Sequence, residues 1–138
     1  MRRVRILLAD DHTLVRQGLR KVLEDRPEWE VVAEASDGRE AVRLAEQHHP
    51  DVAILDVAMP LLNGIEATRQ ITRRVPATRV LILSMHADEA YVTQILQAGA
   101  TGYLLKESAD VDLMQAVSAV SAGKSFFSPA IARVMLDD

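Results

Sequence analysis

Polar side chains that could do chemistry follow four of the short apolar runs in this sequence. They are two adjacent carboxylates, a third carboxylate, a hydroxyl and an ammonium: Asp10, Asp11, Asp56, Ser84 and Lys106. In open sheets of parallel strands, ligands bind beyond the carboxyl ends of the strands. If the apolar runs are strands of one such sheet, these side chains line one of its edges.

Three clustered carboxylates repel one another, and one of them would take up a proton unless a cation is present. Oxygen ligands without cysteine favour a hard ion, so we predict Mg²⁺, held by one or two carboxylates and several waters. The ion would screen Asp56 and neutralise an incoming phosphoryl group, with Lys106 as a second positive charge and Ser84 as a donor. A carboxylate can then act as the nucleophile and form an aspartyl phosphate.

Each of these residues also has a purely structural interpretation. Asp11 could cap the helix that follows it. His12 could contact waters of the ion, although a role at the helix N-terminus is the favoured interpretation. The joint occurrence of acids, a hydroxyl and an amine after separate runs nevertheless favours a chemical role for the set.

The apolar runs are mostly continuous, which is typical of strands covered on both faces. Segments in which apolar residues recur with helical spacing separate these runs, which cover residues 4–9, 31–35, 52–55, 80–83 and 102–105. Residues typical of helix starts and ends lie between these runs or after the last of them: Asp37 with Glu40, Asn63 with Glu66, Ser108, Pro50, Pro76, Gly99 and Gly123.

Five βα units in a row predict an α/β fold with a doubly wound parallel sheet between two layers of helices. Ser128 and Pro129 then open a short C-terminal extra helix that runs roughly to Met135. We expect one domain over 1–125, followed over 126–138 by this helix and the start of a linker.

Composition narrows the class of protein. The chain has 138 residues, of which 49% are hydrophobic and 26% charged, as in a folded domain. A net charge of -4 argues against a nucleic-acid surface, and the absence of cysteine excludes disulfides and thiolate chemistry. The first apolar run is too short for a signal peptide, and no run could span a bilayer, so we expect a cytoplasmic location without a membrane partner.

Four stretches of the chain resemble the receiver domains of bacterial two-component response regulators. They are LLADDHTLVRQGL, PDVAILDVAMPLLNGIEAT, VLILSMHAD and AGATGYLLKES, in the order and spacing of that family. They most resemble the NarL/FixJ subfamily. This resemblance implies a flavodoxin-like (βα)5 fold with strand order 2-1-3-4-5.

The resemblance also implies roles for individual residues. Asp56 would be the phosphoacceptor, and Mg²⁺ would be bound by Asp10, Asp11, Asp56 and the backbone carbonyl of Ala58. Ser84 would be the switch hydroxyl, Tyr103 the switch aromatic and Lys106 the partner of the phosphoryl group. Two further positions would tune the lifetime of the phosphoryl group, namely Ala58 and His86. Leu61 stands where glycine is frequent in the family.

By this resemblance the protein is a signalling switch and not an enzyme, apart from self-catalysed phosphotransfer and autodephosphorylation. A sensor histidine kinase would supply the phosphoryl group. Ser84 would then move towards it, and Tyr103 would swing inward to alter a surface used by a homodimer or an output domain. We expect DNA to be bound only through an output domain that this chain lacks, with transcription regulation as the result.

Three other functions compete with this interpretation. A degenerate receiver would act as an interaction module without phosphorylation. It would not need chemically competent residues at the five principal positions, yet this sequence has them at all five. A hydrolase of the haloacid-dehalogenase type needs a second aspartate where Ala58 stands. A flavin-binding module needs a loop after the first strand that accepts phosphate, and this loop is acidic.

Overall fold

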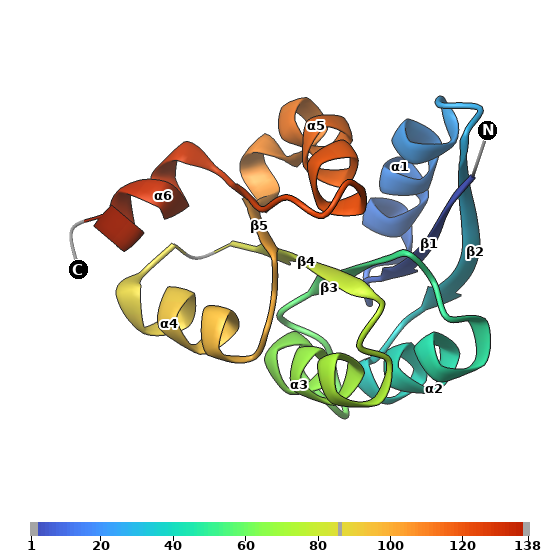
Figure 1. The fold of residues 1–138 in the computed structure, drawn as a ribbon, viewed down its shortest axis with the longest axis horizontal. Coiled ribbons are helices and arrows are strands. Elements are labelled where there is room, and N and C mark those ends of the chain that lie inside the picture. Colours follow the sequence, from blue (N-terminus) through green and yellow to red (C-terminus); the bar gives the residue numbers. More distant parts are fainter. Residues whose placement is uncertain (1–2, 86, 137–138) are drawn as a thin grey trace.

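A computed structural model describes residues 3–85 and 87–136 of the chain. Strands and helices alternate along it, as the sequence predicts (Figure 1). In chain order the elements are β1 (Val4–Ala9), α1 (Thr13–Glu24), β2 (Trp29–Ala35), α2 (Gly38–His48), β3 (Val52–Asp56), α3 (Gly64–Arg74), β4 (Arg79–Ser84), α4 (Glu89–Gln97), β5 (Gly102–Leu105), the 3-10 turn η1 (Lys106–Ser108), α5 (Ala109–Ser121), β6 (Phe126–Phe127) and α6 (Pro129–Leu136).

The described strands form one parallel sheet in the order β2-β1-β3-β4-β5-β6. Helices α1 and α5 cover one face, and α2, α3 and α4 cover the other (Figure 1). This arrangement confirms the doubly wound flavodoxin-like fold and the order 2-1-3-4-5. The sixth strand was not predicted, because two residues are too few to give a strand pattern.

The sheet separates two hydrophobic clusters, one beneath each layer of helices. Leu55 and Ile82 belong to the cluster on the side of α2 and α3, whereas Ile54 and Leu81 belong to the cluster on the side of α5. All five residues of β3 are buried, since this strand lies in the middle of the sheet and both faces are covered. This coverage of both faces explains why the apolar runs of the sequence are continuous.

The predicted helix signals are confirmed at most positions. The side chains of Asp37 and Asn63 accept hydrogen bonds from the backbone N–H of Glu40 and Glu66, at 2.8 and 2.9 Å. Gly99 and Gly123 follow α4 and α5 with φ angles of 104° and 85°. Ser108 precedes α5, but its side chain does not cap the helix and donates instead to the carbonyl of Leu105.

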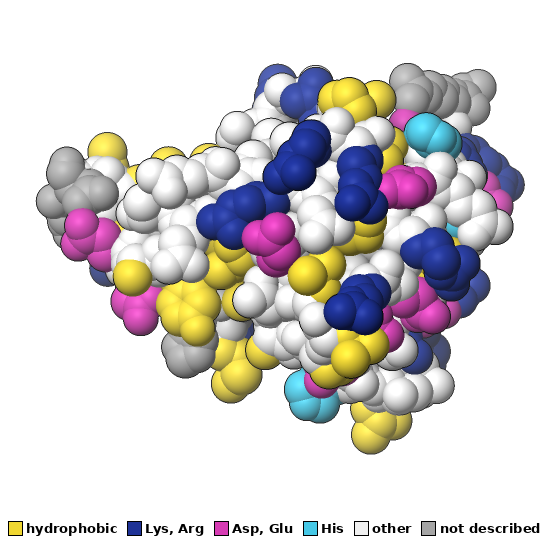
Figure 2. All heavy atoms as spheres, turned by 90° about the horizontal axis from the view of Figure 1, so that it is seen from below, with side chains coloured by type: hydrophobic (Ala, Val, Ile, Leu, Met, Phe, Trp, Pro, Cys, Tyr) yellow, Lys and Arg dark blue, Asp and Glu magenta, His cyan; other side chains and the backbone are white. Residues whose placement is uncertain are grey.

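Helices α2 and α3 carry arginines that ion-pair with acids on the same surface. Figure 2 views the molecule from the α2–α3–α4 side and shows basic and acidic side chains interspersed there. Arg69 pairs with Glu66 at 2.8 Å, and Arg74 pairs with Glu46 of α2 at 2.9 Å. Within residues 3–85 and 87–136, no helix is long and apolar enough to cross a membrane.

The last two elements are attached to the edge of the sheet beside β5. Phe126 and Phe127 pair with Gly102 and Tyr103 of that strand. Beyond them the buried Ser128 continues the ladder, since its N–H donates to the carbonyl of Tyr103 at 3.0 Å and its Oγ accepts from the N–H of Leu105 at 3.2 Å. Helix α6 then packs against α4. The segment after α5 is therefore hydrogen-bonded to the strand that carries Tyr103.

Candidate functional site

The five residues singled out at the ends of the apolar runs meet at one edge of the sheet. Asp10 follows β1, Asp56 ends β3, Ser84 ends β4 and Lys106 follows β5. Because all these strands are parallel, their carboxyl ends lie together. A pocket of about 540 Å³ opens at this edge, and it is lined by side chains that include His12, Asp56, Ser84 and Lys106.

Lys106 pairs with two of the acids in the pocket. Its Nζ lies 3.0 Å from Oδ2 of Asp56 and 3.3 Å from Oδ2 of Asp10. Asp10 is fully buried, and Asp56 is 2% exposed. Such charges need a partner in the interior, because an unpaired buried charge is costly.

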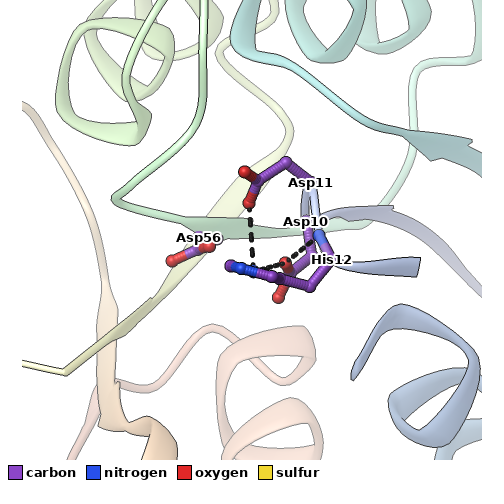
Figure 3. Close-up of side chains that lie close together, drawn as sticks. All are labelled: Asp10, Asp11, His12 and Asp56. Atoms are coloured by element: carbon purple, nitrogen blue, oxygen red, sulfur yellow. Dashed lines mark hydrogen bonds and ion pairs between the residues drawn. The ribbon is translucent and has the colours of Figure 1, made fainter. Parts of the chain in front are cut away.

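The negative charge of this cluster exceeds what Lys106 supplies. Asp10, Asp11, His12 and Asp56 each bring a possible ligand atom within 4.8 Å of the others, as Figure 3 shows for their side chains. Oδ2 of Asp10 and Oδ1 of Asp11 are buried and accept no hydrogen bond from the described residues. Oxygens left in this state are the ligands that a hard divalent cation requires, so the cluster fits such an ion.

Burial and mutual repulsion shift the ionisation of the paired groups. Burial raises the pKa of Asp56, as does the charge of Asp10, and the hydrogen bond from Lys106 opposes the rise. Burial lowers the pKa of Lys106, but the pairs with Asp56 and Asp10 outweigh it and the net shift is upward. Lys106 is therefore a fixed positive charge, and Asp56 gains from any further cation that keeps it ionised.

Ser84 and Tyr103 are directly connected next to this pocket. Both are buried, and their side chains share a hydrogen bond. Burial raises the pKa of the Tyr103 hydroxyl, and the bond with Ser84 opposes this. The ring of Tyr103 is already inside the protein in this structure, so an inward swing is not needed to bury it.

The loop after β3 brings backbone atoms to the site. The N–H of Ala58 donates to Oδ1 of Asp56 at 3.3 Å, and its side chain is exposed. Leu61 has a φ of 67°, which explains why glycine would suit this position. His86, expected to tune the lifetime of a phosphoryl group, lies outside the described residues.

Gly64 allows the start of α3 to pack on the backbone of Asp56. A Cβ at this position would lie 2.3 Å from the carbonyl oxygen of Asp56 and 2.8 Å from Cα of Val57. The N–H of Gly64 also donates to the carbonyl of Val57 at 2.9 Å. The glycine is therefore required by close approach, which fixes the end of β3.

Sequence reasoning missed two residues that hold the site in place. Arg16 lies on α1, and its guanidinium donates to the carbonyl of Asp10 at 2.6 Å and pairs with Glu34 at 3.0 Å. Ser128 was interpreted only as a helix start, yet its hydroxyl binds the backbone just before Lys106. No sequence signal links Arg16 to Glu34 or Ser128 to Leu105, which are distant in the chain.

The structure does not show Asp11 capping α1, which was the alternative interpretation of this residue. The residue at the N-cap position of α1 is His12 rather than Asp11, and its side chain makes no capping hydrogen bond. The imidazole instead turns towards the acids (Figure 3), with Nδ1 3.3 Å from Oδ1 of Asp11 and 3.4 Å from Oδ1 of Asp10. The loop after β1 therefore faces the pocket.

Comparisons with known proteins agree with this geometry. The family model of the response regulator receiver domain matches residues 6–118. The transcriptional regulatory protein DegU of Brevibacillus brevis is 43% identical over 136 residues, which are 99% of this chain and 58% of DegU. The transcriptional regulatory protein LiaR of Bacillus subtilis is 41% identical over 96% of this chain and 63% of its own length. The chain thus spans about three fifths of these curated relatives.

Comparison with solved structures indicates the same family. A LuxR-family two-component response regulator from Aurantimonas sp. SI85-9A1 superposes with a TM-score of 0.93 at 43% identity, covering 98% of this chain and 96% of its own. The receiver domain of the response regulator NarL from Mycobacterium tuberculosis superposes with a TM-score of 0.86 at 39% identity, covering 90% and 100%. This chain belongs to the response regulator receiver domain family, in its NarL/FixJ subfamily.

Proposed function

We propose that this receiver domain is a signalling switch that accepts a phosphoryl group on Asp56 from a sensor histidine kinase. The observation that carries the proposal is the position of Asp56, which is buried against the ammonium of Lys106 and beside two further acids. Phosphoryl transfer needs mainly positioning and charge stabilisation, and this site offers both. A degenerate receiver, which is not phosphorylated, would not need these acids and the lysine to meet at one site.

In the transfer step an Oδ atom of Asp56 forms a bond to phosphorus. The P–N bond of the donor phosphohistidine breaks, and the imidazole leaves with the electron pair and takes up a proton. Lys106 and the hydroxyl of Ser84 stabilise the phosphoryl oxygens. Mg²⁺, held by Asp10, Asp11, Asp56 and the carbonyl of Ala58, would add the remaining positive charge when bound.

The hydrogen bond between Ser84 and Tyr103 links the pocket to the strand β5, along which a change in the pocket can be transmitted. When Ser84 moves to donate to the phosphoryl group, the hydrogen bond that it shares with Tyr103 transmits this change to β5. Tyr103 lies on β5, and its carbonyl accepts from Ser128 at the start of α6. The response then reaches the edge formed by β5, β6 and α6. The inward swing of Tyr103 on phosphorylation, which the sequence analysis expects, stays a prediction.

The output that we propose is control of transcription. DegU and LiaR are regulatory proteins of this kind, and both are longer than this chain. RcsB, a structural relative at 29% identity, has been solved as dimers bound to DNA. By analogy, this receiver would act through a homodimer, and DNA would be bound by an output domain. The cytoplasmic location expected from the sequence remains part of this proposal.

The test is labelling with a small phosphodonor. The protein is incubated with Mg²⁺ and acetyl phosphate, and its intact mass is compared with those of D56N and of D25N, which alters an exposed carboxylate. We expect one phosphoryl group on the wild type and on D25N and none on D56N. Equal labelling of D56N would refute the assignment.

A further inference from the structure

The imidazole of His12 lies on the acid cluster, and this position is set by the backbone. The N–H of His12 donates to Oδ1 of Asp10 at 2.9 Å, which fixes the turn after β1. The ring then projects over the acids (Figure 3), where Nδ1 is 3.3 Å from Oδ1 of Asp11 and 3.4 Å from Oδ1 of Asp10. The side chain is 64% exposed, so its place does not come from packing in a core.

These separations match those between ligands of one metal ion. Octahedral ions with bonds of about 2.1 Å have neighbouring ligand atoms about 3 Å apart and opposite ones about 4.2 Å apart. The imidazole nitrogen therefore stands at nearly the distance of a neighbouring ligand from both carboxylates. One ligand atom each from Asp10, Asp11, His12 and Asp56 lies within 4.8 Å of the others, slightly more than the distance between opposite ligands of such an ion.

A separate observation is that Lys106 alone does not balance the negative charge of this cluster. Asp10 is fully buried, and its Oδ2 accepts no hydrogen bond from the described residues, although the ammonium of Lys106 lies 3.3 Å away. Three carboxylates face one ammonium in this cluster. A cation between the acids would satisfy the orphaned oxygens and remove the repulsion.

The nitrogen changes which cation is preferred. Mg²⁺ favours oxygen ligands and retains its waters, whereas imidazole suits divalent transition metals. We infer that His12 is a metal ligand that shifts the selectivity of this site from Mg²⁺ towards divalent transition ions. The inference rests on the metal site of the proposed function and adds to it the residue that selects the ion.

Mn²⁺ is the probe for this inference, because its electron spin reports nitrogen ligands. Pulsed EPR of Mn²⁺ bound to the wild type should show modulation from a ¹⁴N nucleus, and H12N should lose it. Asparagine is a favoured N-cap residue, so α1 should remain folded in H12N. The matched control is H48N, which alters a histidine at the end of α2 and should keep the modulation.

Affinity gives a second, independent measurement. Titration of free Mn²⁺, followed by competition with Mg²⁺, yields both dissociation constants. H12N should weaken Mn²⁺ binding by about tenfold and Mg²⁺ binding by about twofold or less, in line with the loss of one ligand that only the transition ion uses. Equal weakening of both ions, no weakening, or nitrogen modulation that persists in H12N would overturn the inference.

The inference and the proposed function fail in different ways. If the wild type binds Mn²⁺ without nitrogen modulation, or binds no Mn²⁺, His12 is not a ligand. Labelling of the wild type by acetyl phosphate in Mg²⁺ is measured separately and decides the proposed function. An unlabelled wild type that shows nitrogen modulation would retain the metal site and reject the phosphorylation.

Discussion

The Nζ atom of Lys106 lies 3.0 Å from Oδ2 of Asp56, although the two residues are 50 positions apart and β4 separates their strands in the sheet. The register explains this closeness. Asp56 pairs with Leu83, and Ser84 pairs with Leu105, so β3, β4 and β5 end at nearly the same level. The lysine that follows β5 can then extend over β4 to reach the acid.

Replacing Lys106 with methionine should slow the labelling of Asp56 without abolishing it. The substitution removes an ammonium that pairs with Asp56 and Asp10 while retaining most of the side-chain volume. Hydrogen bonds to charged groups are worth about 1.5–3 kcal/mol, so we expect a rate about 10- to 100-fold lower with acetyl phosphate. The exposed Lys124, replaced in the same way, is the control. An unchanged rate in K106M would show that this pair does not assist transfer.

Replacing Asp56 with asparagine should stabilise the metal-free protein at neutral pH. The pKa of Asp56 is raised in the folded state by burial and by Asp10, so the folded protein binds more protons than the unfolded chain. Stability therefore falls as pH rises from the ordinary carboxyl pKa through the raised one. D56N removes this cost, and we expect a melting temperature a few degrees higher, which corresponds to about 1 kcal/mol.

The measurement is urea unfolding in EDTA over a series of pH values. The gap between D56N and the wild type should widen as pH increases through that window and then stay constant. A gap that is constant over the whole range would contradict the direction of the pKa shift, because only a group that titrates differently in the two states produces a slope.

Divalent ions should stabilise the wild type more than D11N. A ligand that binds only the folded state adds about 2.7 kcal/mol when its concentration is 100 times its dissociation constant. Oδ1 of Asp11 accepts no hydrogen bond from the described residues. D11N therefore removes a possible metal ligand without breaking a hydrogen bond to that atom. Thermal unfolding with and without Mg²⁺ measures the difference. The same shift in both proteins would mean that the ion binds elsewhere.

Gly64 and Gly18 should respond in opposite directions to alanine. In G64A the new Cβ would clash with backbone atoms of Asp56 and Val57, which cannot move without shifting the acceptor, so we expect a loss of several kcal/mol. In G18A the Cβ meets nothing within 4 Å in the middle of α1, and removing a helical glycine should add about 0.5–1 kcal/mol. Urea unfolding of both variants checks the pair. A mild effect in G64A would mean that β3 and α3 are not held in this contact.

The sequence predicted the elements whose signals are local, and it also predicted the site that follows from their order. The continuous run in β3 and the caps at Asp37 and Asn63 are readable within a few residues. Once the strands are known to be parallel, the meeting of Asp10, Asp56 and Lys106 follows from topology alone.

Features that depend on distant partners were not predictable in this way. β6 has two residues and exists only because β5 offers an open edge. The first turn of α1 has an apolar pattern, yet Leu14 is 82% exposed and only Leu23 of that helix is buried, since the pattern does not reveal where the sheet ends. The orientation of His12 towards the acids, rather than along α1, likewise comes from tertiary geometry.

Ser128 offers a test of whether the edge beyond β5 supports Lys106. Its Oγ accepts from the buried N–H of Leu105, and alanine would leave that N–H without a partner. An unsatisfied buried donor costs about 1–3 kcal/mol, so S128A should lower the free energy of unfolding by this amount. Amide exchange at Leu105 should accelerate, because the bond that protects it is gone. The exposed Ser125, replaced by alanine, should change neither quantity. If the Leu105 amide stays protected in S128A, another group holds the end of β5, and α6 is not linked to Lys106 through this serine.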